Sequence, residues 1–501
     1  MKNIIALSAV ALLSTSIYAG TSSEMQAQID MLKAQIAKIE KQQAKIVELE
    51  SKNEAQALKI ETLETKQAKT EKKQKKLGKK IGKVNALAAN DNIKFDLDFR
   101  NTFEALDYDG TINVNGVTND VSGHNDSLLT SRLYLGMAAS PMNGLVFQGK
   151  LGIYSTWGSH IIDESNGAKS WSASSKADDT IMRVKEAYFS YTNKFGEQPY
   201  TFGIGRRSSS NGFLSNYREN EQTPGSPLAH ITNMEVDAAM VMLYWDRFIE
   251  GAYSKFIYGR AHSGEIQGVY GINTDPARTP FVIDDSIEAW EDTPVDFFVT
   301  LGDVYNDGTY QLMYQWAHIF DTKGKNLDTN TNKGAAGVAD LAALSLKVDG
   351  IGDEINDFLD ETIVFASAAY TNYNAKAGNS IIGSEDGGSK DGHSFWVGAV
   401  IPDMITDTGK FGIEYNYGSQ YWTPMTWAED TAIGSKVAVR GSAYEAYWNF
   451  NLFGVKYLPS QVRYTYVQHD YTPNLNCAGW ITPEKADITA QNLRFAVTYR
   501  Y

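Results

Sequence analysis

Charged side chains recur at alternate positions of short segments in which the intervening residues are apolar. Because neighbours two apart on a β-strand share a face, these charges are expected to lie together on a polar face. The set comprises Arg207, Asp237, Glu414, Arg440, Glu445, Arg463 and Arg494. Charges on such a face can filter ions in a channel, and their mixed signs argue against a ladder for anions alone. The alternative is that each forms an ion pair within a protein wall.

A long polar segment, 210–233, follows one of these charged segments. It combines prolines with titratable residues, namely Arg218, Glu219, Glu221 and His230. If the segment folds into an enclosed channel, it would narrow the passage and set its selectivity.

The sequence lacks recognisable catalytic and metal-binding motifs. Seven histidines are present, but no Gly-x-Ser-x-Gly or His-Glu-x-x-His motif, phosphate-binding glycine loop or cysteine pair occurs. Cys477, the single cysteine, cannot form an internal disulfide. We therefore expect no catalytic residue, cofactor or metal. Lipid hydrolysis at a barrel rim is the enzymatic alternative, and an esterase assay would distinguish it.

The segment 491–501 alternates strictly. Leu493, Phe495, Val497, Tyr499 and Tyr501 share one face. About ten residues cross a bilayer as a tilted strand, whereas the plainer interpretation is an edge strand of a soluble sheet. Phe495, Val497, Tyr499 and Tyr501 also resemble the terminal aromatic signal that outer-membrane proteins present to the barrel assembly machinery.

From Ile93 onward, no apolar run reaches the length of about 18 residues that a transmembrane helix needs. An all-β transmembrane barrel of about sixteen antiparallel strands is therefore predicted, with a range of about 14 to 18. The strands are expected at 93–104, 128–139, 144–157, 180–193, 200–209, 234–245, 251–262, 294–303, 309–320, 340–348, 362–373, 393–401, 410–418, 439–450, 460–471 and 488–501.

The connections between these strands fall into two classes. Short turns at 140–143, 194–199 and 305–308 alternate with long polar segments at 105–127, 210–233, 263–293, 374–392 and 419–438. Outer-membrane barrels have short periplasmic turns and long external loops. We therefore expect an outer-membrane barrel with both termini in the periplasm.

The N-terminal 90 residues indicate two further parts. Residues 1–19 combine a charged start, an apolar run and a small-residue cleavage site, which predicts a secretory signal peptide. Residues 20–90 are expected to form a periplasmic coiled coil, because apolar residues recur in alternating steps of four and three. The barrel would then span 91–501.

The coiled-coil stripe predicts self-association, with a trimer favoured. Its oligomerisation residues are Ile29, Leu32, Ile36, Ile39, Ile46, Leu49, Asn53, Ile60, Leu63, Leu77, Ile81 and Val84. A single helix lying on the same chain is the alternative. Lysines crowd 66–83, and peptidoglycan, a barrel rim or solvent could meet them. A formal net charge of -14 argues against nucleic acid as a partner.

Several loose motifs resemble an uncharacterised porin-like outer-membrane family of epsilonproteobacteria. They comprise Gly203–Ser209, Arg218, Thr223, Pro224, Pro227–His230, Asn233, Asp237, Phe411–Gly418, Trp422, Arg440, Gly441, Tyr444, Glu445 and Tyr447. Ser208 stands where the family tends to have proline. The resemblance implies a signal peptide, a helical N-terminal stretch and a barrel.

These observations predict an outer-membrane porin that passes ions and small polar solutes passively and is constricted by 210–233. The overall acidity leans toward cations. Trp422, Trp427 and Trp448 are expected in the aromatic girdle at the membrane edge. The alternative function is structural: the coiled coil would tether the membrane to the cell wall, with a closed or plugged barrel.

Overall fold

The computed structural model describes residues 93–501, with gaps at 115, 158–181, 222, 263–293, 353–354, 407, 427–428, 430 and 474–481, together with ten positions between 27 and 45. The chain divides into two units, Met1–Asn85 and Ala86–Tyr501.

In the first unit, the ten described positions are α-helical and exposed, Ile29 among them. The remaining predicted seam residues, from Leu32 to Val84, and the predicted signal peptide lie outside the described residues. The coiled coil and its self-association therefore stay predictions. No helix in the described part of the chain combines the length and apolar character needed to cross a membrane.

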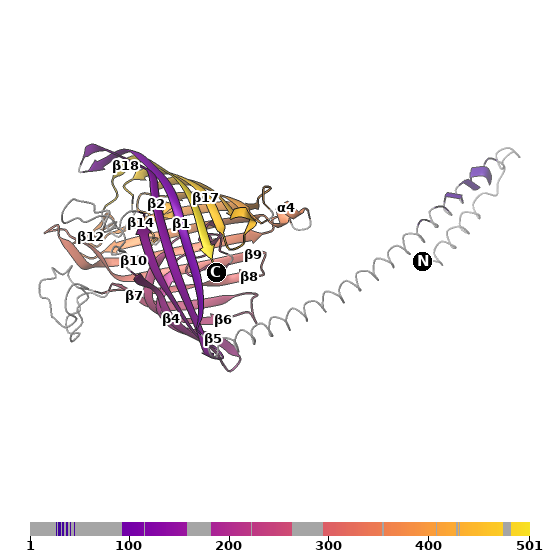
Figure 1. The fold of residues 1–501 in the computed structure, drawn as a ribbon, viewed down its shortest axis with the longest axis horizontal. Coiled ribbons are helices and arrows are strands. Elements are labelled where there is room, and N and C mark those ends of the chain that lie inside the picture. Colours follow the sequence, from indigo (N-terminus) through magenta and orange to yellow (C-terminus); the bar gives the residue numbers. More distant parts are fainter. Residues whose placement is uncertain are drawn as a thin grey trace, which may run out of the picture. The chain divides into compact units, whose positions relative to one another are not determined.

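The second unit is one closed antiparallel sheet, in which each long strand pairs with its neighbours in sequence and β1 pairs with β18 (Figure 1). The long strands are β1 (Lys94–Val114), β2 (Val117–Met142), β3 (Leu145–Thr156), β4 (Met182–Phe195), β5 (Gln198–Ser209), β6 (Met234–Tyr244), β7 (Tyr253–His262), β8 (Val295–Asn306), β9 (Tyr310–Asn326), β10 (Asn332–Asp349), β11 (Ile363–Ala375), β14 (Ser389–Pro402), β15 (Lys410–Gly418), β16 (Gly441–Asn451), β17 (Pro459–Tyr471) and β18 (Lys485–Arg500).

Two very short strands, β12 (Asn379–Ile381) and β13 (Ser384–Glu385), form a small hairpin in the connection between β11 and β14. Strands β11 and β14 pair directly with each other. Without these two, the eighteen-stranded sheet is a barrel of sixteen long strands. The predicted barrel and its strand number are therefore confirmed. Helix α4 (Asp357–Asp360) lies in the connection 350–362 between β10 and β11.

The predicted loop 105–127 is wrong. These residues extend β1 and β2 into a hairpin in which Val114 pairs with Val117, and β18 continues to pair along it as far as Ile112 opposite Ala486. The polar side chains suggested a loop, but a hairpin with solvent on both faces accepts them, since backbone pairing does not depend on side-chain polarity. The hairpin is the indigo projection in Figure 1.

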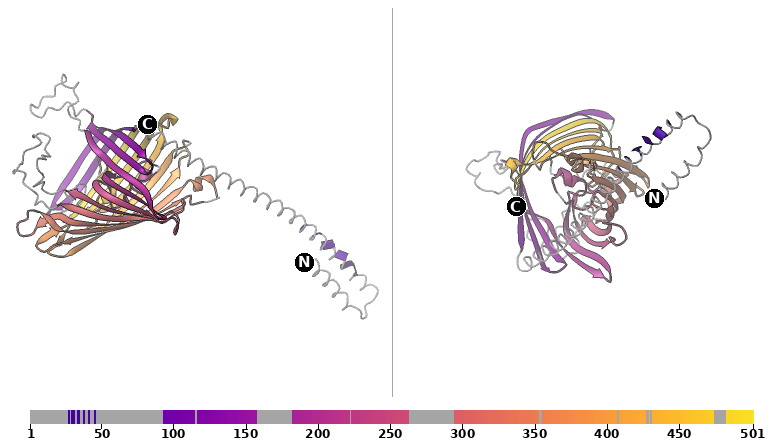
Figure 2. Two further views of the ribbon diagram at one scale, coloured as in Figure 1. Left: turned by 90° about the horizontal axis from the view of Figure 1, so that it is seen from below. Right: turned by 90° about the vertical axis from the view of Figure 1, so that its right-hand side faces the viewer.

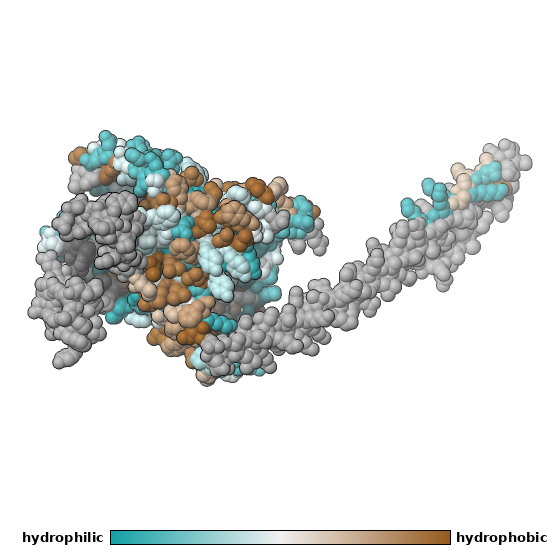
Figure 3. Space-filling model, in the orientation of Figure 1, coloured by the Kyte–Doolittle hydropathy of each residue, from teal (hydrophilic) through white to brown (hydrophobic). Residues whose placement is uncertain are grey.

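Side chains alternate between the two faces of the barrel wall. On β18, Asn492, Arg494 and Thr498 are buried on the inner face, whereas Leu493 and Tyr499 are exposed on the outer face. Figure 3 shows apolar residues gathered on the outer surface of the strands, with polar residues toward the ends. The outer face therefore has the polarity of a surface that contacts lipid.

Much of the hydrophobic core lies inside the barrel. The inner faces of β8 to β11 contribute apolar side chains such as Phe297, Leu301 and Leu341. The segment between β5 and β6 covers them with Phe213, Leu214, Leu228 and Ile231, which are at most 1% exposed. This side of the interior is consequently packed with side chains.

Close packing inside the wall generates the first prediction. A Cβ added at Gly412 on β15 would overlap the ring of Tyr447 on β16, which is buried. Gly412→Ala should lower the free energy of unfolding by about 1–3 kcal/mol through overpacking. Urea unfolding of protein folded into lipid vesicles measures this effect.

Tyr447→Leu provides the control, because it removes the ring atoms that the new methyl group would meet. The double variant should lose less stability than the two single variants together. Additive losses would show that contact with Tyr447 is not the cause.

Candidate functional site

The segment 210–233 crosses the interior of the barrel, where its short helix α3 (Ser215–Arg218) is enclosed by the strands (Figure 2). The backbone N–H of Leu228 donates to Gln315 Oε1 of β9 at 2.7 Å. On the opposite wall, Gln461 of β17 donates to the Arg218 carbonyl at 2.5 Å. These bonds attach the segment to inward-facing side chains on both sides of the lumen.

His230 anchors the same segment in a buried position. Its two ring nitrogens lie 2.7 Å from Ser367 Oγ on β11 and 2.9 Å from Ser394 Oγ on β14. Burial lowers the pKa of His230 to about 3, so its ring is neutral at physiological pH. Because His230 is 0% exposed, this Ser–His arrangement holds the segment to the wall and offers no access to a substrate.

A second connection, 419–440 between β15 and β16, also folds inward. Asn233 N–H donates to the Met425 carbonyl at 2.7 Å, and Met425 N–H donates to the Ile231 carbonyl at 2.9 Å. Trp422 is fully buried and donates through Nε1 to the Val437 carbonyl at 2.8 Å. The two connections therefore pack against each other inside the barrel.

Trp422 thus contradicts its expected place in an aromatic girdle. Trp448 stacks on Phe411 and Phe450 in the wall, with their ring centroids 5.6 and 4.1 Å away. Trp427 lies outside the described residues. Sequence alone could not place Trp422, because the inward fold of its connection depends on contacts with 210–233.

A buried ionic network joins both connections to the wall. Arg218 Nη2 lies 2.5 Å from Glu429 Oε1, and Arg218 Nη1 lies 3.6 Å from Glu445 Oε1. Lys436 Nζ is 3.1 Å from Glu445 and 2.5 Å from Glu414. Because all five side chains are at most 8% exposed, each charge depends on the others for compensation.

The network continues toward β17, β18 and β1. Arg463 Nη2 lies 3.1 Å from Glu219 Oε1, and Arg494 Nε lies 3.6 Å from Glu104 Oε1. Glu104 also accepts the backbone N–H of Ala432, at 2.8 Å. Cations and carboxylates alternate along these contacts, so the charges of this network largely compensate one another.

The pKa values of buried carboxyl groups in the two infolded connections shift in opposite directions. Burial alone would raise the pKa of Glu219, but Arg463 and Arg218 outweigh it and hold that pKa below its ordinary value. Burial raises the pKa of Glu429 despite the opposing effect of Arg218. Burial also raises the pKa of Glu221, together with the charge of Glu219.

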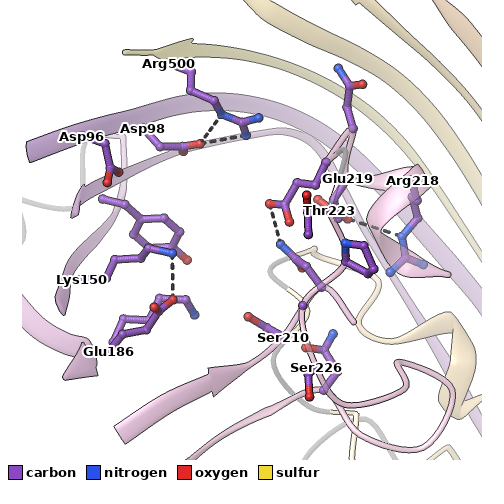
Figure 4. Close-up of a pocket in the computed structure, with 18 of the residues that line it drawn as sticks. Asp96, Asp98, Lys150, Glu186, Ser210, Arg218, Glu219, Thr223, Ser226 and Arg500 are labelled. Carbon is purple, nitrogen blue, oxygen red and sulfur yellow. Dashed lines mark hydrogen bonds and ion pairs between the residues drawn. The ribbon is translucent and has the colours of Figure 1, made fainter. Parts of the chain in front are cut away.

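The other side of the interior contains a polar cavity of about 1050 Å³, bounded by 210–226 and by the inner faces of β1 to β7 (Figure 4). Asp98 lies 2.8 Å from Arg132 and 2.9 Å from Arg500. Lys150 bonds Glu186 at 2.8 Å. The cavity extends to Tyr501 and Thr408, at the barrel end that carries the short turns.

Most predicted pore residues face the interior, in two groups. Arg207, Arg218, Glu219 and Glu221 line the cavity. The others are buried behind it in the packed side: His230, Glu414, Arg440, Glu445, Arg463 and Arg494. Arg440 donates to the Trp422 carbonyl at 3.0 Å and to Thr423 Oγ1 at 2.6 Å, so it supports the second connection.

Asp237 is on the outer face, contrary to its predicted inward position. It lies 3.0 Å from Arg206, and its side chain is 57% exposed. Residues at the alternate parity, Ala238 and Met240, line the cavity. Strand β6 is apolar at both parities because its inner face also packs in the interior, so alternation could not identify its faces.

Several interior charges were not predicted from the sequence. Lys436 and Glu429 lie in a connection expected to be external, and only the tertiary structure brings them inside. Lys150 alternates with apolar outward residues of β3, so parity could have identified it. Lys185 lies at a bulge of β4, where it and its neighbour Glu186 both line the cavity, so parity could not have identified it. Within the described ranges, no group of three or more His, Cys, Asp or Glu side chains could hold a metal ion.

Comparison with known families gives a match over most of the barrel. Residues 122–498 match the sequence model of the family described as "Protein of unknown function (DUF3373)". The chain belongs to this family. The expected membership of an uncharacterised family is thereby confirmed, while an epsilonproteobacterial origin stays a prediction. Comparison with curated proteins finds no match.

Solved structures that are similar to this chain include outer-membrane proteins at low identity. The anion-selective porin from Comamonas acidovorans gives a TM-score of 0.44 at 14% identity, covering 82% of this chain and 99% of the porin. Pseudomonas putida OprB gives 0.43 at 12%, covering 83% and 96%. Vibrio cholerae OmpT, solved as a trimer form, gives 0.41 at 12%, covering 82% and 99%.

The buried network yields a stability prediction. Arg218→Met would leave Glu429 and Glu445 without their shared cation, which should lower the free energy of unfolding by about 3–5 kcal/mol. Urea unfolding in vesicles measures the loss. Arg247→Met is the control: the Arg247–Glu197 pair is exposed, and its loss should cost less than about 1 kcal/mol. Equal losses in the two variants would refute a special role for the buried network.

Glu219 yields a prediction on pH. Its folded-state pKa is lowered, so its stabilising contribution is present above the ordinary glutamate value of about 4.3 and is lost as pH falls toward the folded value. The difference in free energy of unfolding between the wild type and Glu219→Gln should therefore be constant from about pH 5 to about pH 8, which lie above this value. The difference should shrink at lower pH. A difference that does not change on acidification would contradict the assigned ion pairs.

Proposed function

We propose that this chain is an outer-membrane porin through which ions and small polar solutes diffuse passively. The observation that carries the proposal is the polar cavity of about 1050 Å³ inside a closed barrel of sixteen long strands. Barrels of about 16 to 18 strands are wide enough to enclose an aqueous channel. Passive diffusion needs no catalytic residue or cofactor, and we propose none.

The polarity of the two faces supports placement in the outer membrane. Exposed apolar side chains such as Phe395, Ile413 and Leu493 lie on the outside, while charged side chains lie within. A bilayer-spanning barrel needs this distribution because its wall contacts lipid outside and water inside. In the proposed aromatic assembly signal, Phe495, Val497 and Tyr499 belong to the same strand as Leu493, and Tyr501 directly follows that strand.

The segment 210–233 would act as the constriction. It fills the interior next to β8 to β11 and leaves the cavity between its own Glu219 and Glu221 and the wall formed by β1 to β7. Solutes would therefore pass between acidic groups of this segment and basic groups of the wall. Such opposed charges orient polar solutes and slow apolar ones.

The N-terminal unit is proposed to be a periplasmic coiled coil, cleaved from its signal peptide after residue 19 and associating into a trimer. Its partners would be further copies of this chain, and peptidoglycan is a candidate for the lysine-rich 66–83. Outer-membrane lipid and the barrel assembly machinery are the partners proposed for the barrel.

A second function is favoured by a specific observation. Both infolded connections are held by a hydrophobic core and a buried ionic network, as expected for a plug. In this case the barrel would be closed, and the coiled coil would tether the outer membrane to the cell wall.

Single-channel recording of the purified protein in a planar bilayer separates the two functions. A porin should give stepwise conductance, with steps in groups of three for a trimer, whereas a plugged barrel should be silent. Heat-denatured protein is the control for leakage. Deletion of residues 24–88 should preserve the conductance of a porin but impair the envelope if tethering is the function. Silence from folded, inserted protein would overturn the porin proposal.

A further inference from the structure

Arg207 on β5 is held in an unusual position on the wall of the cavity. Its guanidinium group lies over Gly203, because a Cβ at Gly203 would overlap Arg207 Nη2. It also stacks on the ring of Tyr188, with the guanidinium carbon 4.0 Å from the ring centroid. The glycine and the aromatic ring together fix the guanidinium flat against the wall.

The backbone next to Arg207 requires glycine at position 205. Gly205 has a φ of +131°, and a Cβ there would overlap the Ala187 carbonyl. Only glycine accommodates both conditions without strain. The Gly203-Ile-Gly-Arg-Arg motif found in the sequence therefore has a physical role, which is to seat Arg207 inside while Arg206 points outward to Asp237.

Arg207 forms no ion pair with a carboxylate among the residues that the structure describes. Its Nε and Nη2 atoms are buried and have no hydrogen-bond partner in the described structure. Glu186, whose charge acts on Arg207, is bonded to Lys150 at 2.8 Å. The guanidinium is therefore desolvated on its buried edge without an acceptor, which is costly for a charged group.

A second cation without a carboxylate faces the same cavity. Lys255 on β7 donates from Nζ to Ser226 Oγ at 2.9 Å and forms no ion pair with the carboxylates that the structure describes. It lies near enough to Arg207 for their charges to repel each other.

Other cations of this wall are compensated. Arg132 is paired with Asp98 at 2.8 Å, Lys150 with Glu186 at 2.8 Å, and Lys185 with Glu235 at 2.6 Å. Arg207 and Lys255 therefore form a local excess of two positive charges, which neighbouring residues do not neutralise. An anion in the cavity would offset this excess charge.

We propose that Arg207 and Lys255 form an anion-binding site for small solutes with two negative charges, such as a dicarboxylate or a phosphate. A guanidinium group and an ammonium group on the wall of one cavity together attract a solute that carries two negative charges. Hydroxyl groups of Ser210, Thr223 and Ser226 line the same cavity and can donate to further oxygens (Figure 4).

This inference rests on the proposed porin function and specifies its solutes. It reverses the expectation of cation preference drawn from the net charge of -14. Much of the negative charge inside the barrel is neutralised within the buried network, so the sum over the chain does not describe the wall of the cavity.

Equilibrium binding tests the site without requiring conduction. Succinate and inorganic phosphate would be titrated separately into the full-length protein in detergent, with isothermal calorimetry as the readout. Saturable binding of either anion is expected, and Arg207→Gln or Lys255→Gln should weaken it by about tenfold or more, since each removes a charged partner. The preferred anion identifies the class of solute.

Two further variants make the test specific. Arg206→Gln removes the same charge from the adjacent residue on the outer face and should bind as the wild type does. Arg207→Lys should recover part of the affinity, because it restores the charge without the planar fork. Circular dichroism and resistance to heat unfolding in detergent confirm that each variant is folded.

Reversal potentials in a potassium succinate gradient provide the transport readout. The wild type should favour the anion, Arg207→Gln should shift the potential toward potassium, and Arg206→Gln should not. Absence of anion binding by folded wild-type protein, or equal binding by Arg207→Gln, overturns the site even if the channel conducts. Binding by a silent barrel supports the site and overturns only the porin function.

Discussion

Closure of the sheet through β1 and β18 is the constraint on which the rest of the structure depends. Backbone N–H and C=O groups that face lipid have no water to bond, so every strand needs a partner on both sides. The pairing of β1 with β18, from Asp98 opposite Arg500 to Ile112 opposite Ala486, removes the two free edges. Closure then divides the side chains into an outer and an inner set, which meet different solvents.

The inner set divides again, into a packed half and a polar half. Apolar residues of β8 to β11 would be unstable against water, and the infolded segment 210–233 covers them with Leu228, Ile231 and their neighbours. Packing the segment to one side leaves the cavity on the other. The hydrophobic effect within the barrel thus decides where the cavity lies, and charged side chains then line that cavity.

Charges inside the barrel have two roles because their surroundings differ. In the packed half, pairing with carboxylates offsets the cost of desolvating Arg218 and Lys436. These pairs also attach two connections to the wall. In the polar half, Arg207 and Lys255 line the cavity beside hydroxyl groups and pair with no carboxylate in the described part of the chain. Residues of the same type therefore form ion pairs in one half and line a cavity in the other.

The sequence by itself determined the barrel, its sixteen long strands and the face to which most charged residues belong. These properties follow from period-two alternation and from the alternation of short and long connections, both of which are local. Local patterns failed where a strand is apolar at both parities, as around Asp237, and where polar residues continue a hairpin, as in 105–127. Only the tertiary structure decided that 419–440 folds inward beside 210–233 and that Arg207 packs against Tyr188 on the wall of the cavity, because both depend on contacts between residues far apart in the chain.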